Sequence, residues 1–101
     1  MDRFVALADP TRRRIVEMLG ERALAAGEIT AHFSMSAPAI SQHLKVLREA
    51  RLVRVQPAGA SNIYFIDRHG LAAMRAWVDR MWGDALEAFR EEINAEQEAE
   101  R

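Results

Sequence analysis

Residues 34–52 read SMSAPAISQHLKVLREARL, and this stretch decides the fold. Ile40, Leu44 and Leu47 recur three or four residues apart, the spacing that places side chains on one face of a helix. Ser36 is a favoured N-cap residue, so we predict a helix that begins there and ends near residues 50–51. The opposite face of this helix is polar and carries Pro38, Ser41, Gln42, Lys45 and Arg48.

The residues before this helix predict the first half of a helix-turn-helix. Asp9 and Pro10 suit the N-cap and the first position of a helix, which we expect to end at Gly20. A short amphipathic helix over residues 2–8 precedes it. A further short helix over residues 28–33, burying Ile29 and Phe33, leads into the tight connection Ser34-Met35-Ser36.

After the helix the pattern changes to that of strands. Residues 52–56 and 62–66 are strand-like, and the residues between them include Pro and Gly, so they predict a β-hairpin. From about Arg68 a long helix carries apolar residues as far as Ile93. We predict one domain over residues 1–101, mainly α with a small β-hairpin. The predicted architecture is a winged helix-turn-helix with five helices and a two-stranded antiparallel wing.

The composition excludes several classes of function. The 101 residues include no cysteine, which excludes disulfides, thiolate metal sites and a cysteine nucleophile. There is no Gly-rich phosphate loop, no pair of carboxylates framed by apolar residues and no Ser–His–Asp arrangement, so we expect no enzyme and no cofactor. No run approaches the ~20 apolar residues of a membrane span, so we expect no membrane partner and a cytoplasmic location.

Charge is distributed unevenly along the chain. Residues 1–68 hold ten Lys/Arg and seven Asp/Glu, whereas residues 69–101 hold four and eight. The basic balance of residues 1–68 and the acidic balance of residues 69–101 predict that only the N-terminal part binds a polyanion. The run Arg12-Arg13-Arg14 lies at the start of a helix, where the helix dipole disfavours cations. We therefore expect an arginine of this run, Arg12, to face an external anion.

The polar face of the helix around residues 36–50 suits the DNA major groove, which is ~12 Å wide and admits a helix. Side chains at the N-terminal end and outer face of such a helix contact base edges. Gln42 can form two hydrogen bonds to adenine, Ser36 and Ser41 can donate or accept, and Ala37 and Pro38 can touch thymine methyl groups.

Two basic side chains follow on the same helix. Lys45 and Arg48 are expected to reach phosphates, which fix the register but carry no sequence information. For His43 two interpretations remain open, a buried or phosphate-facing structural role and a base contact.

Two stretches of the sequence resemble one known family. SAPAISQHLKVLREARLV (residues 36–53) closely resembles the recognition helix of the ArsR family of bacterial repressors, and ADPTRRRIVEML (residues 8–19) is similar to the start of that family's second helix. The resemblance covers roughly residues 3–93. It implies a homodimer joined through its first and last helices, repressing transcription from an imperfect palindrome. It also implies DNA contacts at Ala37, Pro38, Ser41 and Gln42.

The expected wing departs from the family pattern. Many members carry Arg or Lys at the tip, whereas this chain has Ala-Gly-Ala-Ser-Asn over residues 58–62. We expect a weak contribution from the uncharged tip, partly compensated by Arg54 at its base. The complete predicted set of DNA contacts is Ser36, Ala37, Pro38, Ser41, Gln42, His43, Lys45, Arg48, Arg12, Arg54, Ser61 and Asn62.

The last helix carries more apolar surface than one small domain covers easily, since its apolar residues form two neighbouring rows. Exposed Trp and Phe in quantity indicate a partner, so we predict a homodimer. In the alternative, both rows pack on the chain's own hairpin and first helices, and a small-molecule pocket at Trp77 and Trp82 is a further alternative. The predicted interface residues are Phe4, Leu7, Trp77, Met81, Trp82, Leu86 and Phe89.

A metal site is not expected. Founding members of the family sense metals through cysteines or through Asp, His and Glu ligands on the last helix. Asp67-Arg68-His69 is similar to the first part of the Asp, His and Glu ligand pattern. Arg80 and Gly83, however, stand where a further His and Glu should follow. We predict that Asp67 or His69 caps the last helix instead. The identity of any inducer stays open.

A hypothesis from another class is a winged helix used for protein association alone, because a fold does not dictate DNA binding. It requires an apolar outer face on the helix around residues 36–50. The polar residues of that face argue against it.

Overall fold

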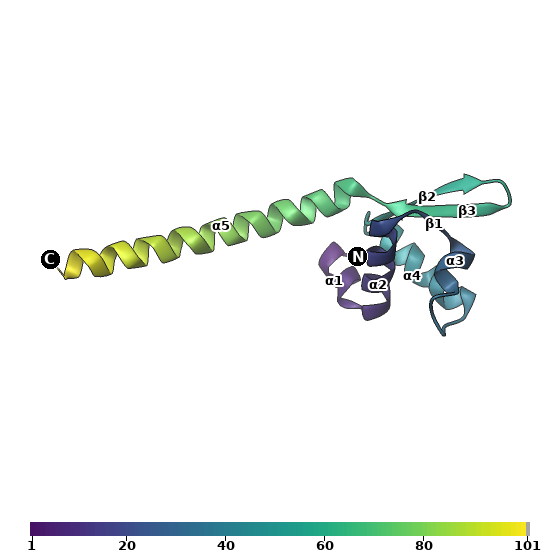
Figure 1. Cartoon of the computed structure of the whole chain (residues 1–101), viewed down its shortest axis with the longest axis horizontal. Coiled ribbons are helices and arrows are strands. Elements are labelled where there is room, and N and C mark those ends of the chain that lie inside the picture. The colour runs from purple at the N-terminus through teal and green to yellow at the C-terminus, as the bar shows by residue number, and fades with distance from the viewer. Residues whose placement is uncertain (101) are drawn as a thin grey trace. The chain divides into compact units, whose positions relative to one another are not determined.

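Five helices and three strands follow one another along residues 1–100, the part of the chain that the structure describes. In this computed structural model, residues 1–71 form one compact unit, and the chain from Ala72 onward forms a second. The elements are α1 (Arg3–Ala8), α2 (Pro10–Glu21), β1 (Leu24–Ala25), α3 (Ala26–Thr30), α4 (Ala37–Glu49), β2 (Val53–Ala58), β3 (Ser61–Ile66) and α5 (Arg68–Ala99) (Figure 1). The predicted class, mainly α with five helices and a small β-hairpin, is confirmed, and the hairpin belongs to a three-stranded antiparallel sheet.

An aspartate caps each of the first two helices, and the cap at Asp9 was predicted. Asp2 Oδ1 accepts a hydrogen bond from the amide of Phe4 at 2.7 Å. Asp9 Oδ1 accepts from the amides of Thr11 at 2.9 Å and Arg12 at 3.1 Å. These bonds satisfy N–H groups that have no partner inside a helix, which fixes where α1 and α2 begin.

The third helix lies earlier than predicted. α3 covers Ala26–Thr30 rather than residues 28–33, and Phe33 is half-buried rather than buried. Glu28 accounts for the early start, because its Oε1 accepts a hydrogen bond from the amide of Ala25 at 3.0 Å. Five residues are too few to show a helical period, so apolar spacing alone could not place the ends of α3.

The predicted two-stranded wing is part of a three-stranded sheet, a correction to the strand count. β2 and β3 pair antiparallel from Val53 opposite Ile66 to Ala58 opposite Ser61. β1 pairs with the other edge of β3 and sets Leu24 opposite Tyr64, which gives the strand order β1-β3-β2. A strand of two residues has no alternation to detect, which is why the sequence pattern missed β1.

One core holds the first unit together, and Figure 1 shows α1 to α4 grouped beside the sheet. Side chains from three helices and from the start of β2 meet in this core. Each fully buried Ile or Leu contributes about 1.5–3 kcal/mol relative to leaving it in water. The largest fully buried side chains are those of Ile15, Ile29, Ile40, Leu44, Leu47, Leu52 and Val53.

The end of α4 is a Schellman motif with an arginine in the left-handed conformation. Arg51 has φ 59°, its amide donates to the carbonyl of Arg48 at 3.0 Å, and the amide of Leu52 donates to the carbonyl of Leu47 at 3.0 Å. Glycine usually occupies this position, because a side chain disfavours positive φ. Leu47 and Leu52 occupy the two positions whose apolar side chains commonly pack together in this motif, and both are fully buried.

The first turn of α5 lies against this motif. Asp67 caps the helix, one of the two predicted alternatives, since its Oδ1 accepts from the amides of His69 at 3.1 Å and Gly70 at 3.4 Å. Gly70 is buried, and a Cβ at this position would overlap the carbonyl oxygen of Arg51 and lie 3.2 Å from Nε of Arg3. The junction of α1, α4 and α5 therefore requires glycine at position 70.

Over the described residues, the second unit contains the part of α5 that follows Leu71. The whole helix has 32 residues, a length of ~48 Å at the usual rise per residue. Among the described residues of that unit, no second element covers its apolar side chains, which include Met81, Trp82, Leu86 and Phe89. Within residues 1–100, no helix combines the length and the apolar character needed to cross a membrane.

Replacing Gly70 by Ala should destabilise the first unit by about 1–3 kcal/mol, because the added methyl group forces the Arg51 carbonyl away. Urea unfolding followed by circular dichroism measures the change. Gly20→Ala is the matched control, since a Cβ there meets open space and alanine favours a helix. Equal stability of the two variants would contradict the described junction.

Candidate nucleic-acid interface

The N-terminal end of α4 is capped and exposed. Ser36 has extended backbone angles, and its Oγ accepts a hydrogen bond from the amide of Ala39 at 3.3 Å. Ala37 and Pro38 fill the first two helical positions and are exposed. Pro38 loses nothing here, because an N–H in the first turn has no acceptor inside the helix. This end of α4 therefore presents a cap and two small side chains to the surroundings.

The two faces of α4 differ sharply. Ile40, Leu44 and Leu47 are at most 2% exposed and belong to the core. The outer face of α4, which we define as Ser41, Gln42, Lys45 and Arg48, is exposed throughout. The burial of three apolar side chains sets the rotation of α4, and this rotation leaves the outer face accessible.

His43 lies at the border of the two faces and contacts α2. Its Nδ1 lies 3.4 Å from a terminal guanidinium nitrogen of Arg12, which donates to the ring when the imidazole proton is on Nε2. Arg12 also donates from Nε to the carbonyl of Ala6 at 2.7 Å. Arg12 thus links α1, α2 and α4, and His43 is half-buried beside it. This geometry favours the structural interpretation of His43.

The arginine run at the start of α2 has acceptors inside the chain. Besides the bonds of Arg12, Arg13 donates to the carbonyl of Leu7 at 3.4 Å, and Arg14 lies 3.6 Å from Glu17. These partners give a local reason for cations near a helix N-terminus. A DNA contact by Arg12 stays a prediction.

The wing is uncharged at its tip and basic at its base. Gly59 has φ 63° and, with Ala60, closes the two-residue turn between Ala58 and Ser61, a turn class that favours glycine. Ser61 and Asn62 follow this turn and are exposed.

At the base of the wing, Arg54 stands opposite Phe65 in the register, with its guanidinium carbon 5.5 Å from the ring centre. This is within the range of a cation–π contact, so the ring orients the guanidinium group. The sequence predicted Arg54 as a candidate contact but gave no sign of the aromatic partner.

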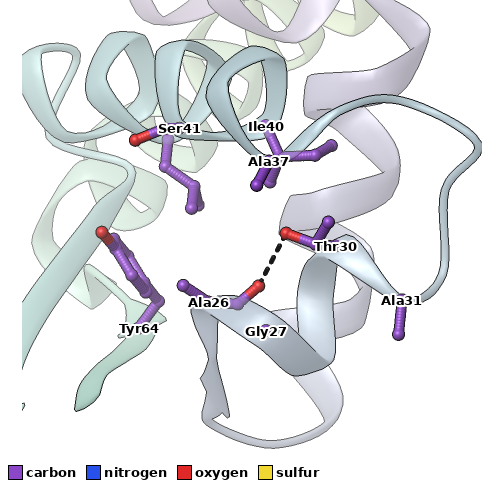
Figure 2. A pocket seen from close by; sticks show the side chains of 9 residues that line it. Ala26, Gly27, Thr30, Ala31, Ala37, Ile40, Ser41 and Tyr64 are labelled. Carbon is purple, nitrogen blue, oxygen red and sulfur yellow. Dashed lines mark hydrogen bonds between the residues drawn. The ribbon is translucent and has the colours of Figure 1, made fainter. Parts of the chain in front are cut away.

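A cavity beside α4 involves residues that the sequence pattern did not single out. It has a volume of about 440 Å³ and lies between α3, α4 and β3 (Figure 2). Thr30 and Tyr64 line it together with Ser41 of the outer face. Because these residues come from three separate elements, no local motif reveals the cavity.

Candidate metal ligands do not come together in the structure. Asp67 caps α5, and Nδ1 of His32 lies 2.8 Å from the carbonyl oxygen of Glu28. Within residues 1–100, no three side chains of His, Asp or Glu are placed to share a metal ion.

Comparison with known proteins gives consistent matches. A family model described as the bacterial regulatory proteins of the arsR family matches residues 9–55. The HTH-type transcriptional regulator Rv2034 of Mycobacterium tuberculosis is 50% identical over 91 residues, which cover 90% of this chain and 85% of that protein. The transcriptional repressor SdpR of Bacillus subtilis is 35% identical over 75 residues, which cover 74% of this chain and 83% of that protein.

A solved structure matches the fold as well. The homodimeric winged helix-turn-helix DNA-binding domain from Mycobacterium bovis superposes with a TM-score of 0.63 at 25% identity. The match covers 78% of this chain and 73% of that chain.

The pKa of Asp9 generates a test of how α2 is anchored. The hydrogen bond from the backbone amide of Arg12 lowers this pKa, and the bond from Thr11 adds to the effect. In acid the unfolded chain therefore binds more protons than the folded protein does. The contribution of Asp9 to the free energy of unfolding is lost as pH falls through its lowered pKa. Asp9→Asn keeps a good N-cap residue but removes the charge and its titration.

We expect Asp9→Asn to be about 0.3–1 kcal/mol less stable at neutral pH, the usual value of a charge at a helix N-terminus. This difference should vanish in acid. Urea unfolding of both proteins between about pH 7 and pH 2 measures it. A difference that stays constant with pH would show that the Asp9 carboxylate does not stabilise α2 through its charge.

Proposed function

The chain belongs to the ArsR family of bacterial regulatory proteins, and from this membership we propose that it is a homodimeric repressor that reads an imperfect palindrome in DNA. The observation that carries the proposal is the exposed outer face of α4 behind its capped N-terminus. A helix with a small-residue tip and polar outer side chains fits the major groove, where the base edges are distinguishable.

Base contacts are assigned to the N-terminal half of α4. Gln42 is exposed and can form two hydrogen bonds to adenine, and Ser41 can donate or accept. Ala37 and Pro38 offer apolar contact to thymine methyl groups, and Ser36 lies at the same end.

Phosphate contacts are assigned to the remaining basic and polar residues of the predicted set. Lys45 and Arg48 extend the outer face towards the C-terminal end of α4. Arg54, Ser61 and Asn62 of the wing, and Arg12 and His43 near the base of α4, complete the proposed set. Contacts of this kind position the protein on DNA and make its affinity depend on salt.

A homodimer gives the proposed binding its strength. One subunit offers few phosphate contacts, whereas two subunits present two α4 helices to half-sites about one helical turn apart, ~34 Å. The homodimeric domain from Mycobacterium bovis supports this assembly. The proposed interface residues lie on α1 and α5: Phe4, Leu7, Trp77, Met81, Trp82, Leu86 and Phe89.

The relatives support the remaining parts of the proposal. A 35% identical relative is named a transcriptional repressor, which supports repression rather than activation. A DNA-binding repressor of a bacterium acts in the cytoplasm, and the proposed role needs no catalytic activity.

Gln42→Ala and Lys45→Ala test the assignment of contacts. Loss of a two-bond contact to a base should cost about 1–3 kcal/mol on the bound operator and relax discrimination among operator variants. Loss of Lys45 should weaken all DNA about equally and reduce the salt dependence by about one phosphate contact. Fluorescence anisotropy with the chain's own upstream DNA and with a scrambled duplex separates the two effects.

Gln97→Ala, far along α5, is the matched control and should bind DNA as the wild type does. Identical behaviour of the Gln42 and Lys45 variants would contradict the division into base and phosphate contacts. Equal affinity of the wild type for operator and scrambled DNA would contradict sequence-specific binding altogether.

Trp82→Glu tests the proposed dimer. Trp82 is 67% exposed in the single chain, and a carboxylate placed in an apolar interface is strongly unfavourable. At micromolar concentration the wild type should sediment with twice the monomer mass, and the variant as a monomer. Arg80→Ala, on the opposite side of α5, should remain dimeric. A wild type that sediments as a monomer would contradict the proposed assembly.

A further inference from the structure

The cavity between α3, α4 and β3 has the composition of a ligand site. Its volume of about 440 Å³ lies within the range of small-molecule pockets, ~300–1,000 Å³. Ala26, Ile40 and Leu44 supply apolar walls. Figure 2 shows α4 along one side, α3 with Ala26 and Thr30 along the other, and Tyr64 from β3 between them.

The hydroxyl group of a tyrosine that lines this cavity makes no hydrogen bond to the described part of the chain. Tyr64 is 8% exposed, and its hydroxyl forms no hydrogen bond within residues 1–100. The hydroxyl is not among the fully enclosed unsatisfied atoms of those residues, so it is accessible from outside the core, and Tyr64 is one of the residues that line the cavity. A tyrosine with a buried ring and an accessible hydroxyl can offer that hydroxyl to a ligand in exchange for water.

Two other hydroxyl groups limit what the ligand can be. Thr30 donates its proton to the carbonyl of Ala26 at 2.9 Å, which leaves its oxygen able only to accept (Figure 2). Ser41, like Tyr64, makes no hydrogen bond within the described residues and can donate or accept. None of the nine lining residues is charged. A charged ligand would lose part of its hydration without gaining a counter-charge from these residues, so the lining favours an uncharged one.

We propose that this cavity binds a small, uncharged, mainly apolar organic molecule with one hydroxyl group, and that its occupation weakens DNA binding. The second half rests on the proposed function. Ser41 lines the cavity and also belongs to the outer face of α4, so a ligand and a base compete for one hydroxyl. A ligand that prefers the DNA-free protein lowers DNA affinity by the ratio of its affinities for the two states.

Binding is tested first without DNA, with 2-naphthol as the probe. Titration into the isotope-labelled full chain should shift the amide NMR signals of Ala26, Thr30 and Tyr64 in a saturable way. Naphthalene, which lacks the hydroxyl, should bind about three- to tenfold more weakly, the usual effect of one hydrogen bond. The anion 2-naphthoate should not bind. Absence of saturable shifts at these residues, or equal binding of the anion, would overturn the proposal.

Variants locate the probe within the cavity. Ala26→Leu fills the space and should weaken 2-naphthol binding at least about tenfold. Tyr64→Phe removes the unpartnered hydroxyl and should weaken it about three- to tenfold. Gly20→Ala lies outside the cavity and should leave binding unchanged. If Ala26→Leu binds the probe as the wild type does, the cavity is not the site.

The DNA experiment tests the coupling. Saturating 2-naphthol should raise the dissociation constant of the wild type for its upstream DNA about tenfold. It should leave the DNA affinity of Ala26→Leu unchanged, and this variant without the probe should bind DNA as the wild type does. Probe binding with an unchanged DNA affinity overturns the coupling. If the protein binds no DNA without the probe, the proposed function fails, while the NMR result still decides whether the cavity binds ligands.

Discussion

The burial of one face of α4 is the constraint on which the rest of the molecule depends. Ile40, Leu44 and Leu47 are almost completely removed from water, and each contributes about 1.5–3 kcal/mol. Turning α4 by a third of a rotation would expose them, so the helix has one stable orientation. In that orientation Ser41 and Gln42 are exposed, and the polar surface proposed to read DNA is a consequence of core packing.

Both ends of α4 and one side are also fixed by polar contacts. The Ser36 hydroxyl caps the start, the left-handed Arg51 ends the helix, and Arg12 contacts His43 from α2. The C-terminal end of α4 is closely packed, because the Arg51 carbonyl lies directly against Gly70. A reading surface on a rigidly held helix keeps its side chains in position before DNA arrives, which lowers the entropic cost of binding.

Features that depend on neighbouring residues, such as helix caps, could be predicted from the sequence. Features that depend on contacts between distant segments could not. The caps at Asp9, Ser36 and Asp67 follow from side-chain hydrogen bonding to nearby amides, and the structure contains all three. β1 was missed, and α3 was misplaced, because two and five residues carry no measurable period. The cavity at Tyr64 and the fit at Gly70 join segments far apart in sequence. The outer face of α4 was recognisable from residues 36–48 alone, whereas its DNA contacts remain a proposal.

Selection of DNA from a random duplex library by the purified chain tests the central claim most directly. If α4 reads bases and the chain acts as a dimer, the bound pool should converge on an imperfect palindrome. Its half-sites should lie about one helical turn, ~34 Å, apart. A bound pool with the composition of the starting library would contradict the account, since phosphate contacts alone select no sequence.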